Sequence, residues 1–180
     1  MPILPRTVDI VRATTADAAR LATLAAATFS DTFAADNTAD DMAAYLAQTF
    51  GERRQRDELE APGNLVLFAE RDGQTVGYAM LRDGAAPSCV DGDAPLEIAR
   101  LYAIRGAIGS GIGSALMSAC LETAAERGRD VLWLGVWERN ARAIAFYERW
   151  GFRDVGSQSF QLGTDRQTDR VMMRRVGEAR

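Results

Sequence analysis

Three glycines at alternate positions, Gly109, Gly111 and Gly113, are the residues of this chain best suited to bind a ligand through the backbone. They follow the apolar run 101–104 and precede a helical pattern over residues 111–127, so they occupy a turn between a buried strand and a helix. Because glycine has no Cβ, backbone N–H groups in such a turn approach a ligand closely. The free amides of the first helical turn and the positive end of the helix dipole then favour an anion such as a diphosphate.

The spacing of the glycines disfavours two common motifs that consist of a strand, a glycine-rich turn and a helix. A P-loop needs Gly-Lys-Ser/Thr at the helix start, whereas Gly113-Ser114 follows Ile112 and the chain contains no lysine. A dinucleotide-binding turn needs Gly-x-Gly-x-x-Gly, whereas the run here is Gly-x-Gly-x-Gly. It also needs an acidic residue at the end of a second strand about 20 residues on, and the chain has none there.

Two segments resemble the GNAT superfamily of N-acetyltransferases. The pattern x-x-x-Gly-x-Gly at residues 108–113 resembles its acetyl-CoA loop, and residues 140–152 match its Asn-x-x-Ala-x-x-Phe-Tyr-x-x-x-Gly-Phe element at every fixed position. Residues 134–140, 159–163 and 167–172 are similar to the bacterial spermidine/spermine acetyltransferase branch. The resemblance is good over residues 60–175 and loose before them.

The pattern of apolar residues and breakers indicates an α/β chain. Strands are predicted over residues 8–12, 65–71, 74–82, 96–104, 131–137, 152–160 and 170–174, and Asp72-Gly73 marks a hairpin turn. Helices are predicted over residues 18–29 and 42–50, with a solvated continuation over 52–60, then over 111–127 and from the Asn140 cap to Gly151. The resemblance implies one N-acetyltransferase domain over residues 1–180. It also implies a mixed, mostly antiparallel sheet of six to seven strands, about four flanking helices and splayed central strands.

The resemblance implies acetyl-CoA as co-substrate and places it on named residues. The backbone of Leu101, Tyr102 and Ala103 would bind the pantetheine arm, and Asn140 would meet that arm from the other side. The diphosphate would lie on the amides of Ile108, Gly109, Ser110, Gly111, Ile112, Gly113 and Ser114, with Arg149 near a phosphate. The family generally has Gln or Arg where Ile108 stands, so diphosphate binding is expected to be modestly weaker.

The same resemblance implies two catalytic side chains and one backbone donor. Tyr147 stands where the superfamily places the phenol that protonates the departing CoA thiolate. Glu97 stands where several relatives carry a general base, acting through water. Strict alternation places Glu97 on the face of Ala99 and Leu101, unless a β-bulge shifts the register. A backbone N–H near Ala103 would stabilise the oxyanion.

The acceptor site is expected near the end of the first helix. The stretch 30–37 is predicted to break that helix, and in the superfamily this region forms a wall of the acceptor site. Phe29, Asp31, Phe33 and Asp36 are therefore candidate substrate contacts. The alternative for Phe29 and Phe33, which are four residues apart, is a place in the core on one helical face.

Composition excludes several classes of function. The chain has no histidine, which rules out a Ser-His-Asp or Cys-His mechanism and metal sites that need imidazole, and no metal is expected. A formal net charge of −4 disfavours nucleic acid as a partner. The sequence contains no run of about 18 apolar residues, so no membrane span is predicted. The isolated Cys89 and Cys120 are typical of reduced cysteines, so a cytoplasmic location is expected.

These observations predict an acetyl-CoA-dependent N-acetyltransferase that acetylates the primary amine of a small molecule, with a polyamine such as spermidine as first candidate. A protein acetyltransferase, acting on N-termini or lysines, is an alternative that predicts an open groove around residues 31–41. A non-catalytic CoA-binding module is another, and retention of Glu97 and Tyr147 argues against it. A toxin acting on charged transfer RNA would need a basic surface. Homodimers are common in the superfamily, so a second copy is one expected partner.

Overall fold

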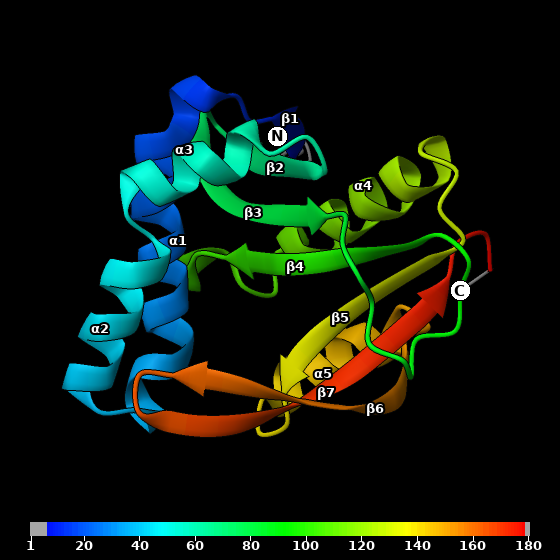
Figure 1. The fold of residues 1–180 in the computed structure, drawn as a ribbon. Helices are drawn as coiled ribbons and strands as arrows, with labels where there is room; N and C mark the ends of the chain where they lie inside the picture. Colours follow the sequence, from blue (N-terminus) through cyan, green and yellow to red (C-terminus); the bar gives the residue numbers. More distant parts are fainter. Residues whose placement is uncertain (1–6, 179–180) are drawn as a thin grey trace.

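The computed structural model describes residues 7–178, whose seven strands form one sheet in the order β1-β2-β3-β4-β5-β7-β6 (Figure 1). Only β4 and β5 pair in parallel, and the other neighbours are antiparallel. The strands are β1 (Asp9–Arg12), β2 (Asn64–Arg71), β3 (Gln74–Arg82), β4 (Pro95–Ala103), β5 (Val131–Trp137), β6 (Arg153–Leu162) and β7 (Asp165–Arg175). The predicted mixed, mostly antiparallel α/β sheet is confirmed.

Helices cover both faces of the sheet (Figure 1). One face carries α1 (Ala18–Phe33), α2 (Ala39–Thr49) and α3 (Glu52–Glu60), and the other carries α4 (Ile112–Glu126) and α5 (Ala141–Arg149). The sequence predicted about four helices, with residues 52–60 as a continuation of the second. The described residues form five α-helices, because Gly51 adopts an extended conformation and starts α3 as a separate helix. In the part of the chain that is described, no helix is long and apolar enough to cross a membrane.

The first helix is longer than predicted. The structure extends α1 to Phe33 and follows it with a short 3-10 turn, Ala34–Asp36. The Thr32 hydroxyl donates back to the carbonyl of Thr28 at 2.8 Å, and the Asn37 side chain donates to the carbonyl of Phe33 at 2.8 Å. These bonds fit a helix that continues and is closed by Asn37, so the prediction of a break over residues 30–37 was wrong for its first four residues.

The two central strands separate after three residue pairs. Pairing between β4 and β5 is confined to residues 95–97 and 131–133 among the described residues, and the gap beyond widens toward α1 (Figure 1). The backbone of β4 from Ile98 to Ala103 therefore has an unpaired edge on the β5 side. An extended ligand can add to such an edge as a further strand would.

A β-bulge in β4 decides which side chains face which core. Arg100 pairs with Met80 and Ile98 with Leu81, so Ala99 is an extra residue in β4. Ile98 and Leu101 both pack on the α4 side of the sheet, whereas Ala99 packs on the side of α1 and α2. Strict alternation from Glu97 onward therefore does not hold, and the β-bulge given as the exception is present.

Candidate active site

A first cavity, which we call the donor cleft, has a volume of about 440 Å³ and runs along the open edge of β4. The glycine turn and the first turn of α4 bound it on one side, and α5 bounds it on the other. Its lining residues are Thr32, Leu101, Tyr102, Ala103, Ile108, Gly109, Gly111, Gly113, Ser114, Asn140, Arg142, Ala143, Phe146, Tyr147 and Arg149. The structure thus brings together most of the residues that the sequence assigned to the co-substrate.

The glycine turn has the backbone geometry that an anion site needs. Gly109 and Gly111 have φ values of 79° and 89°, a left-handed conformation that side chains disfavour. Gly111 caps α4, whose first N–H groups have no acceptor inside the helix. These amides at the floor of the cleft, with the helix dipole behind them, can bind a diphosphate.

Two residues of the predicted loop do not line the cleft. The Ser110 hydroxyl donates to the carbonyl of Ala107 at 2.6 Å and accepts from the Arg71 guanidinium at 3.1 Å. The Ile112 side chain is buried in the core beneath α4. Any role of Ser110 and Ile112 therefore lies with their backbone, not with their side chains.

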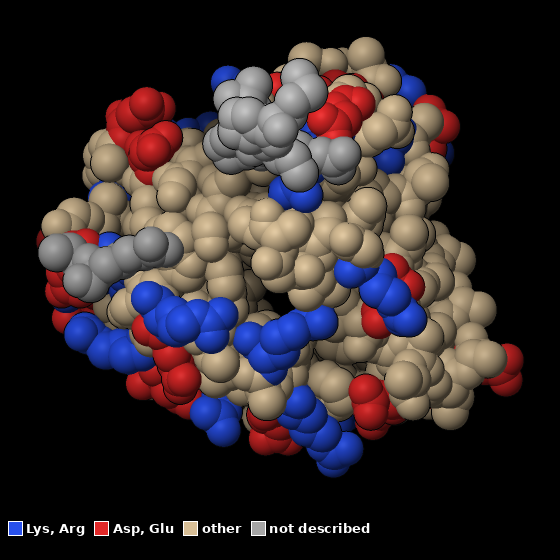
Figure 2. Space-filling view, turned by 180° about the vertical axis from the view of Figure 1, so that it is seen from behind, with Lys and Arg blue, Asp and Glu red and all other residues tan. Residues whose placement is uncertain are grey.

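Three further side chains line the donor cleft, and one of them, Arg142, was not predicted from the sequence. Ile108 is 41 % exposed, although it is apolar, and it lines the cleft. Arg149, for which a phosphate contact was predicted, lines the cleft, and Arg142 joins it from the first turn of α5. Arg142 occupies a free position of the Asn-x-x-Ala motif, so the motif carried no signal for it. Figure 2 shows a hollow near the middle of the face opposite to that of Figure 1, with basic side chains beside it.

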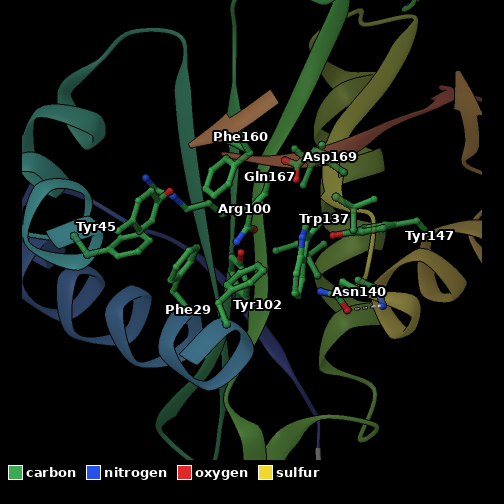
Figure 3. Close-up of a pocket in the computed structure, with 18 residues that line it drawn as sticks. Phe29, Tyr45, Arg100, Tyr102, Trp137, Asn140, Tyr147, Phe160, Gln167 and Asp169 are labelled. Carbon is green, nitrogen blue, oxygen red and sulfur yellow. Dashed lines mark hydrogen bonds between the residues drawn. The ribbon is translucent and has the colours of Figure 1, made fainter. Parts of the chain in front are cut away.

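A second cavity, which we call the acceptor chamber, has a volume of about 140 Å³ and lies between the sheet and helices α1 and α2 (Figure 3). Aromatic rings form much of its wall. Its lining residues are Phe29, Phe33, Tyr45, Phe50, Ile98, Ala99, Arg100, Leu101, Tyr102, Gly135, Val136, Trp137, Asn140, Ala143, Tyr147, Phe160, Gln167 and Asp169. Five of these also line the donor cleft, namely Leu101, Tyr102, Asn140, Ala143 and Tyr147. The two cavities therefore meet at the splayed strands and the start of α5.

Tyr147 lies at this meeting point, and its surroundings keep its phenol protonated. Its ring packs against Phe146 and Phe152, with centroid distances of 5.4 and 5.8 Å, and the side chain is 8 % exposed. Burial raises the pKa of Tyr147 far above its ordinary value, with a smaller contribution from Cys120. A neutral phenol that lines both cavities is placed to donate a proton between them.

Asn140 holds the start of α5 in place. Its side-chain oxygen accepts the N–H of Ala143 at 3.2 Å, shown as a dashed line in Figure 3. This is the N-cap that the sequence predicted. Because that bond uses the side-chain oxygen, the amide NH₂ remains available to a ligand in either cavity.

The structure does not place Glu97 at either cavity. The bulge turns the Glu97 side chain to the same face as Arg100, but its carboxylate pairs with both ends of the Arg82 guanidinium, at 2.9 and 3.0 Å. Both residues lie where β4 is still paired with β5, beyond the open part of the sheet. The geometry therefore gives no support to Glu97 as the base.

The four acceptor candidates divide into two groups. Phe29 and Phe33 line the chamber and also pack in the core beside it, with their ring centroids 4.4 Å apart. Their positions therefore fit both interpretations, a wall of the acceptor site and a place in the core. Asp31 and Asp36 line neither cavity. Asp31 faces outward and pairs with Arg105 at 3.5 Å, because the longer α1 carries it round to the exposed side.

Sequence reasoning missed four polar residues of the chamber: Tyr45, Arg100, Gln167 and Asp169. Arg100 escaped notice because the bulge at Ala99 turns it inward. Gln167 and Asp169 alternate with exposed residues on β7, a period-two pattern that the sequence does contain. Burial raises the pKa of Asp169 to about 6.

The fold and the two cavities define a class of enzyme. The central strands splay apart, the glycine turn offers free amides to an anion, and the two cavities meet at a neutral phenol. This arrangement suits an acyltransferase that takes its acyl group from a coenzyme A thioester. The acetyltransferase (GNAT) family model matches residues 27–152, and the chain belongs to this family. It is therefore an acetyl-CoA-dependent N-acetyltransferase.

Relatives and solved structures agree with this assignment. An uncharacterised N-acetyltransferase of Lactobacillus delbrueckii subsp. lactis is 37 % identical over 90 % of this chain and 94 % of its own length. The PaiA N-acetyltransferase of Thermoplasma acidophilum, solved with coenzyme A, has a TM-score of 0.76 at 18 % identity, covering 94 % of this chain and 99 % of that one. A ribosomal-protein-alanine N-acetyltransferase of Brucella melitensis has a TM-score of 0.66 at 30 % identity, covering 93 % and 99 %.

Replacing Gly113 by leucine should weaken coenzyme A binding by about tenfold or more, equivalent to about 1.4 kcal/mol. A Cβ at Gly113 would lie 3.4 Å from the Phe146 ring, so the rest of the leucine side chain must extend into the donor cleft. Gly113 has no left-handed φ, so the backbone would not be strained. Calorimetric titration with CoA measures the effect. The control is Gly106→Leu, at a position that is open to solvent and lies outside the cleft. Equal Kd values for CoA in the two variants would contradict the placement of the ligand in the donor cleft.

Proposed function

We propose that this enzyme transfers the acetyl group of acetyl-CoA to the primary amine of a small molecule, by direct attack of the amine on the thioester. The observation that carries the proposal is the meeting of the donor cleft and the acceptor chamber at Tyr147 and Asn140. Among the described residues, no cysteine, serine or threonine lines the chamber, so this lining offers no thiol or aliphatic hydroxyl as nucleophile for an acetyl-enzyme intermediate. Holding both substrates in adjoining cavities supplies the proximity that direct transfer needs.

Three groups of this chain would then serve the reaction. The open edge of β4 at residues 101–103 binds the pantetheine arm, and a backbone N–H near Ala103 stabilises the oxyanion that forms on the thioester carbonyl. As the tetrahedral intermediate collapses, the C–S bond breaks and the thiolate takes the proton of Tyr147.

The enclosure of the chamber favours a small acceptor over a polypeptide. The turn between β6 and β7 reaches across to α2, where the carboxylate of Asp41 accepts from the backbone N–H and the hydroxyl of Thr164, at 2.6 and 3.0 Å. This contact holds the β6–β7 turn against α2, next to residues 31–41, where a protein acetyltransferase would need an open groove. The volume of about 140 Å³ is also small, since pockets for drug-sized ligands measure roughly 300 to 1,000 Å³.

A polyamine such as spermidine is the first acceptor to test, because of the similarity of residues 134–140 and 159–172 to the spermidine/spermine branch. The second candidate function is protein N-terminal acetylation, which the 30 % identity to the Brucella ribosomal-protein-alanine enzyme favours. A small-molecule acceptor is also favoured by a mycothiol acetyltransferase of Clavibacter sepedonicus. That protein is 35 % identical over 138 residues, which cover 68 % of this chain and 42 % of its own length.

The test is release of free CoA from acetyl-CoA with a panel of acceptors: spermidine, spermine, lysine, an aminoglycoside and an alanine-ended peptide. Turnover on a small amine, with the acetylated product confirmed by mass, supports the proposal. Turnover on the peptide alone would replace it by protein acetylation. Stabilisation by acetyl-CoA without turnover on any acceptor would favour a binding module.

Substituting Asp41 by alanine should raise the KM for the amine several-fold and leave the KM for acetyl-CoA unchanged. The substitution removes the acceptor that ties Thr164 to α2, so strands β6 and β7, whose Phe160 and Gln167 line the chamber, would be held less firmly beside α2. Steady-state kinetics with each substrate varied in turn measures both constants. Asp40→Ala removes the same charge from the same helical turn and is the control. A rise in the KM for acetyl-CoA alone would contradict this account.

A further inference from the structure

We propose that the carboxylate of Asp169, together with the side-chain oxygen of Gln167, binds the ammonium form of the acceptor, and that Asp169 then removes its proton. The inference rests on the proposed function and deepens it, because it names the charge state of the acceptor and the base. Both residues lie on β7 and line the acceptor chamber, and Figure 3 shows them on its β7 wall.

Asp169 is a buried carboxylate without a partner of opposite charge. It is 9 % exposed, and among the described residues its side chain has no ion pair or hydrogen bond. It stands opposite Trp137 on β5 and Gln158 on β6. A Cβ at Gly135 would lie 2.6 Å from the amide nitrogen of Gln158 and 3.2 Å from a carboxylate oxygen of Asp169, so the glycine makes room for both side chains. A buried charge of this kind is costly unless a ligand completes it.

Gln167 provides independent evidence for a ligand site in the chamber. Its amide NH₂ donates to the side-chain oxygen of Asn37 at 2.7 Å and to the carboxylate of Asp165 at 2.8 Å. These two bonds fix the orientation of the amide and leave its oxygen buried without a donor. Asp169 and Gln167 therefore present two acceptor groups on one wall of the chamber, and neither has a hydrogen-bond donor among the described residues. Two such acceptors are the complement of an ammonium group.

The other groups that face Asp169 do not cancel its charge. Across the chamber, Arg100 on β4 is already paired with Glu58, at 2.8 and 3.1 Å. Burial raises the pKa values of Tyr45 on α2, Tyr102 on β4 and Tyr147 on α5, so these phenols are neutral at pH 7.

The strands beside Asp169 add no cation to the chamber either. On β7, Arg170 lies on the opposite face of the strand and pairs with Asp154 at 3.6 Å. The residues of β5 and β6 that line the chamber carry no charge: Gly135, Val136, Trp137 and Phe160. Asp165, bonded to Gln167, is itself acidic. The chamber is thus net negative with aromatic walls, the surroundings that bind an alkylammonium ion.

The chemistry can be written with every proton accounted for. An alkylamine with a pKa of about 10 reaches the enzyme as R-NH₃⁺. Asp169 takes one proton and frees the lone pair, the nitrogen forms a bond to the thioester carbon, and the C–S bond breaks as Tyr147 protonates the sulfur. The nitrogen loses a second proton, which passes through water to restore the Tyr147 phenol. Asp169 releases its proton when the amide leaves. Burial raises the pKa of Asp169 to about 6, so the group is ionised at neutral pH and is a stronger base than an ordinary carboxylate.

The test is the pH dependence of kcat/KM for Asp169→Asn, with the amine that the wild-type enzyme acetylates best. For the wild type we expect a plateau above pH 6 and a fall below it, as Asp169 takes up a proton. The variant should lose about 10²-fold at pH 7. Its kcat/KM should then rise about tenfold per pH unit toward the pKa of the amine, because only the free amine can react.

Two comparisons separate this role from a structural one. An acceptor of similar size whose amine is mostly unprotonated at pH 7 should suffer much less from Asp169→Asn. Gln167→Leu, which removes the fixed acceptor oxygen, should raise the KM for the cationic amine and leave the pH profile in place. Asp154→Asn is the matched control, since it removes an exposed carboxylate on the far face of the sheet.

The outcomes are distinct. A wild-type enzyme that acetylates no small amine overturns the proposed function itself. An active wild type with an Asp169→Asn profile that keeps its plateau, or with equal losses on charged and uncharged acceptors, overturns the role of Asp169 and leaves the proposed function standing.

Discussion

Replacing Tyr147 by phenylalanine is expected to lower kcat by about 10²-fold, the usual contribution of a positioned general acid. The thiolate would then have to leave without a proton from the enzyme. The KM for acetyl-CoA should stay within about twofold, because the ring that lines both cavities remains and the phenol contributes little to ground-state binding. Steady-state release of free CoA at saturating amine measures kcat directly.

The pH profile carries a second expectation for Tyr147. Burial raises its pKa, so the phenol remains protonated throughout an ordinary assay range and should cause no loss of kcat up to about pH 9. Tyr78→Phe is the matched control, because Tyr78 is fully buried in the core and lines neither cavity. A Tyr147→Phe enzyme with kcat near the wild-type value, or a wild type that loses activity from pH 7 upward, would exclude Tyr147 as the acid.

The parts of the site that the sequence predicted are those encoded over short distances. Gly109, Gly111 and Asn140 act through the backbone or cap of the helix that they begin, and Tyr147 is fixed by the turn of helix that Asn140 starts. Each needs only a strand, a turn and a helix in succession. A local pattern of residue types is enough to specify such an arrangement.

The acceptor chamber could not be predicted in the same way, because its residues meet only through long-range pairing. Gln167 binds Asn37 across 130 positions of the chain, and Asp169 stands opposite Trp137 only because β7 inserts between β5 and β6. One extra residue in β4, Ala99, decides that Arg100 faces inward. Propensity and periodicity do not fix a bulge or a strand order.

Glu97 shows that a family resemblance can assign a role to a residue whose surroundings in this chain do not suit that role. The position on β4 matches, yet Arg82 on the neighbouring strand takes both carboxylate oxygens. Asp169 enters the chamber from the opposite wall instead. The need for a carboxylate near the amine is set by the chemistry, whereas the strand that supplies it depends on which charges are already paired.

The largest effect on stability is expected from Glu58→Ala, which should lower the free energy of unfolding by about 3 to 5 kcal/mol. Glu58 on α3 and Arg100 on β4 form a buried pair, with side chains 7 % and 12 % exposed. Without Glu58, the guanidinium would keep two contacts among the described residues: the side-chain oxygen of Gln55 at 3.1 Å and the ring of Phe50, whose centroid lies 5.0 Å from the guanidinium carbon. Such a loss is a large share of the roughly 5 to 15 kcal/mol that stabilises most domains.

Urea denaturation of the free protein measures this change, and two further variants give it meaning. Glu52→Ala breaks the exposed pair with Arg56 on the same helix and should cost less than about 1 kcal/mol. The double variant Glu58→Leu with Arg100→Leu removes both charges and should recover most of the lost stability, because the penalty comes from the unpaired guanidinium. A double variant no more stable than Glu58→Ala would show instead that the pair itself holds α3 against the sheet.

The Glu58→Ala enzyme should also discriminate less well in favour of cationic acceptors, where it remains folded. An unpaired Arg100 would place a positive charge across the chamber from Asp169 and offset its attraction for an ammonium group. The KM for a charged amine should rise, whereas that for an uncharged amine of the same size should not. Equal changes in the two KM values would mean that Arg100 acts on the chamber through packing alone, and the charge balance that singles out Asp169 would lose its support.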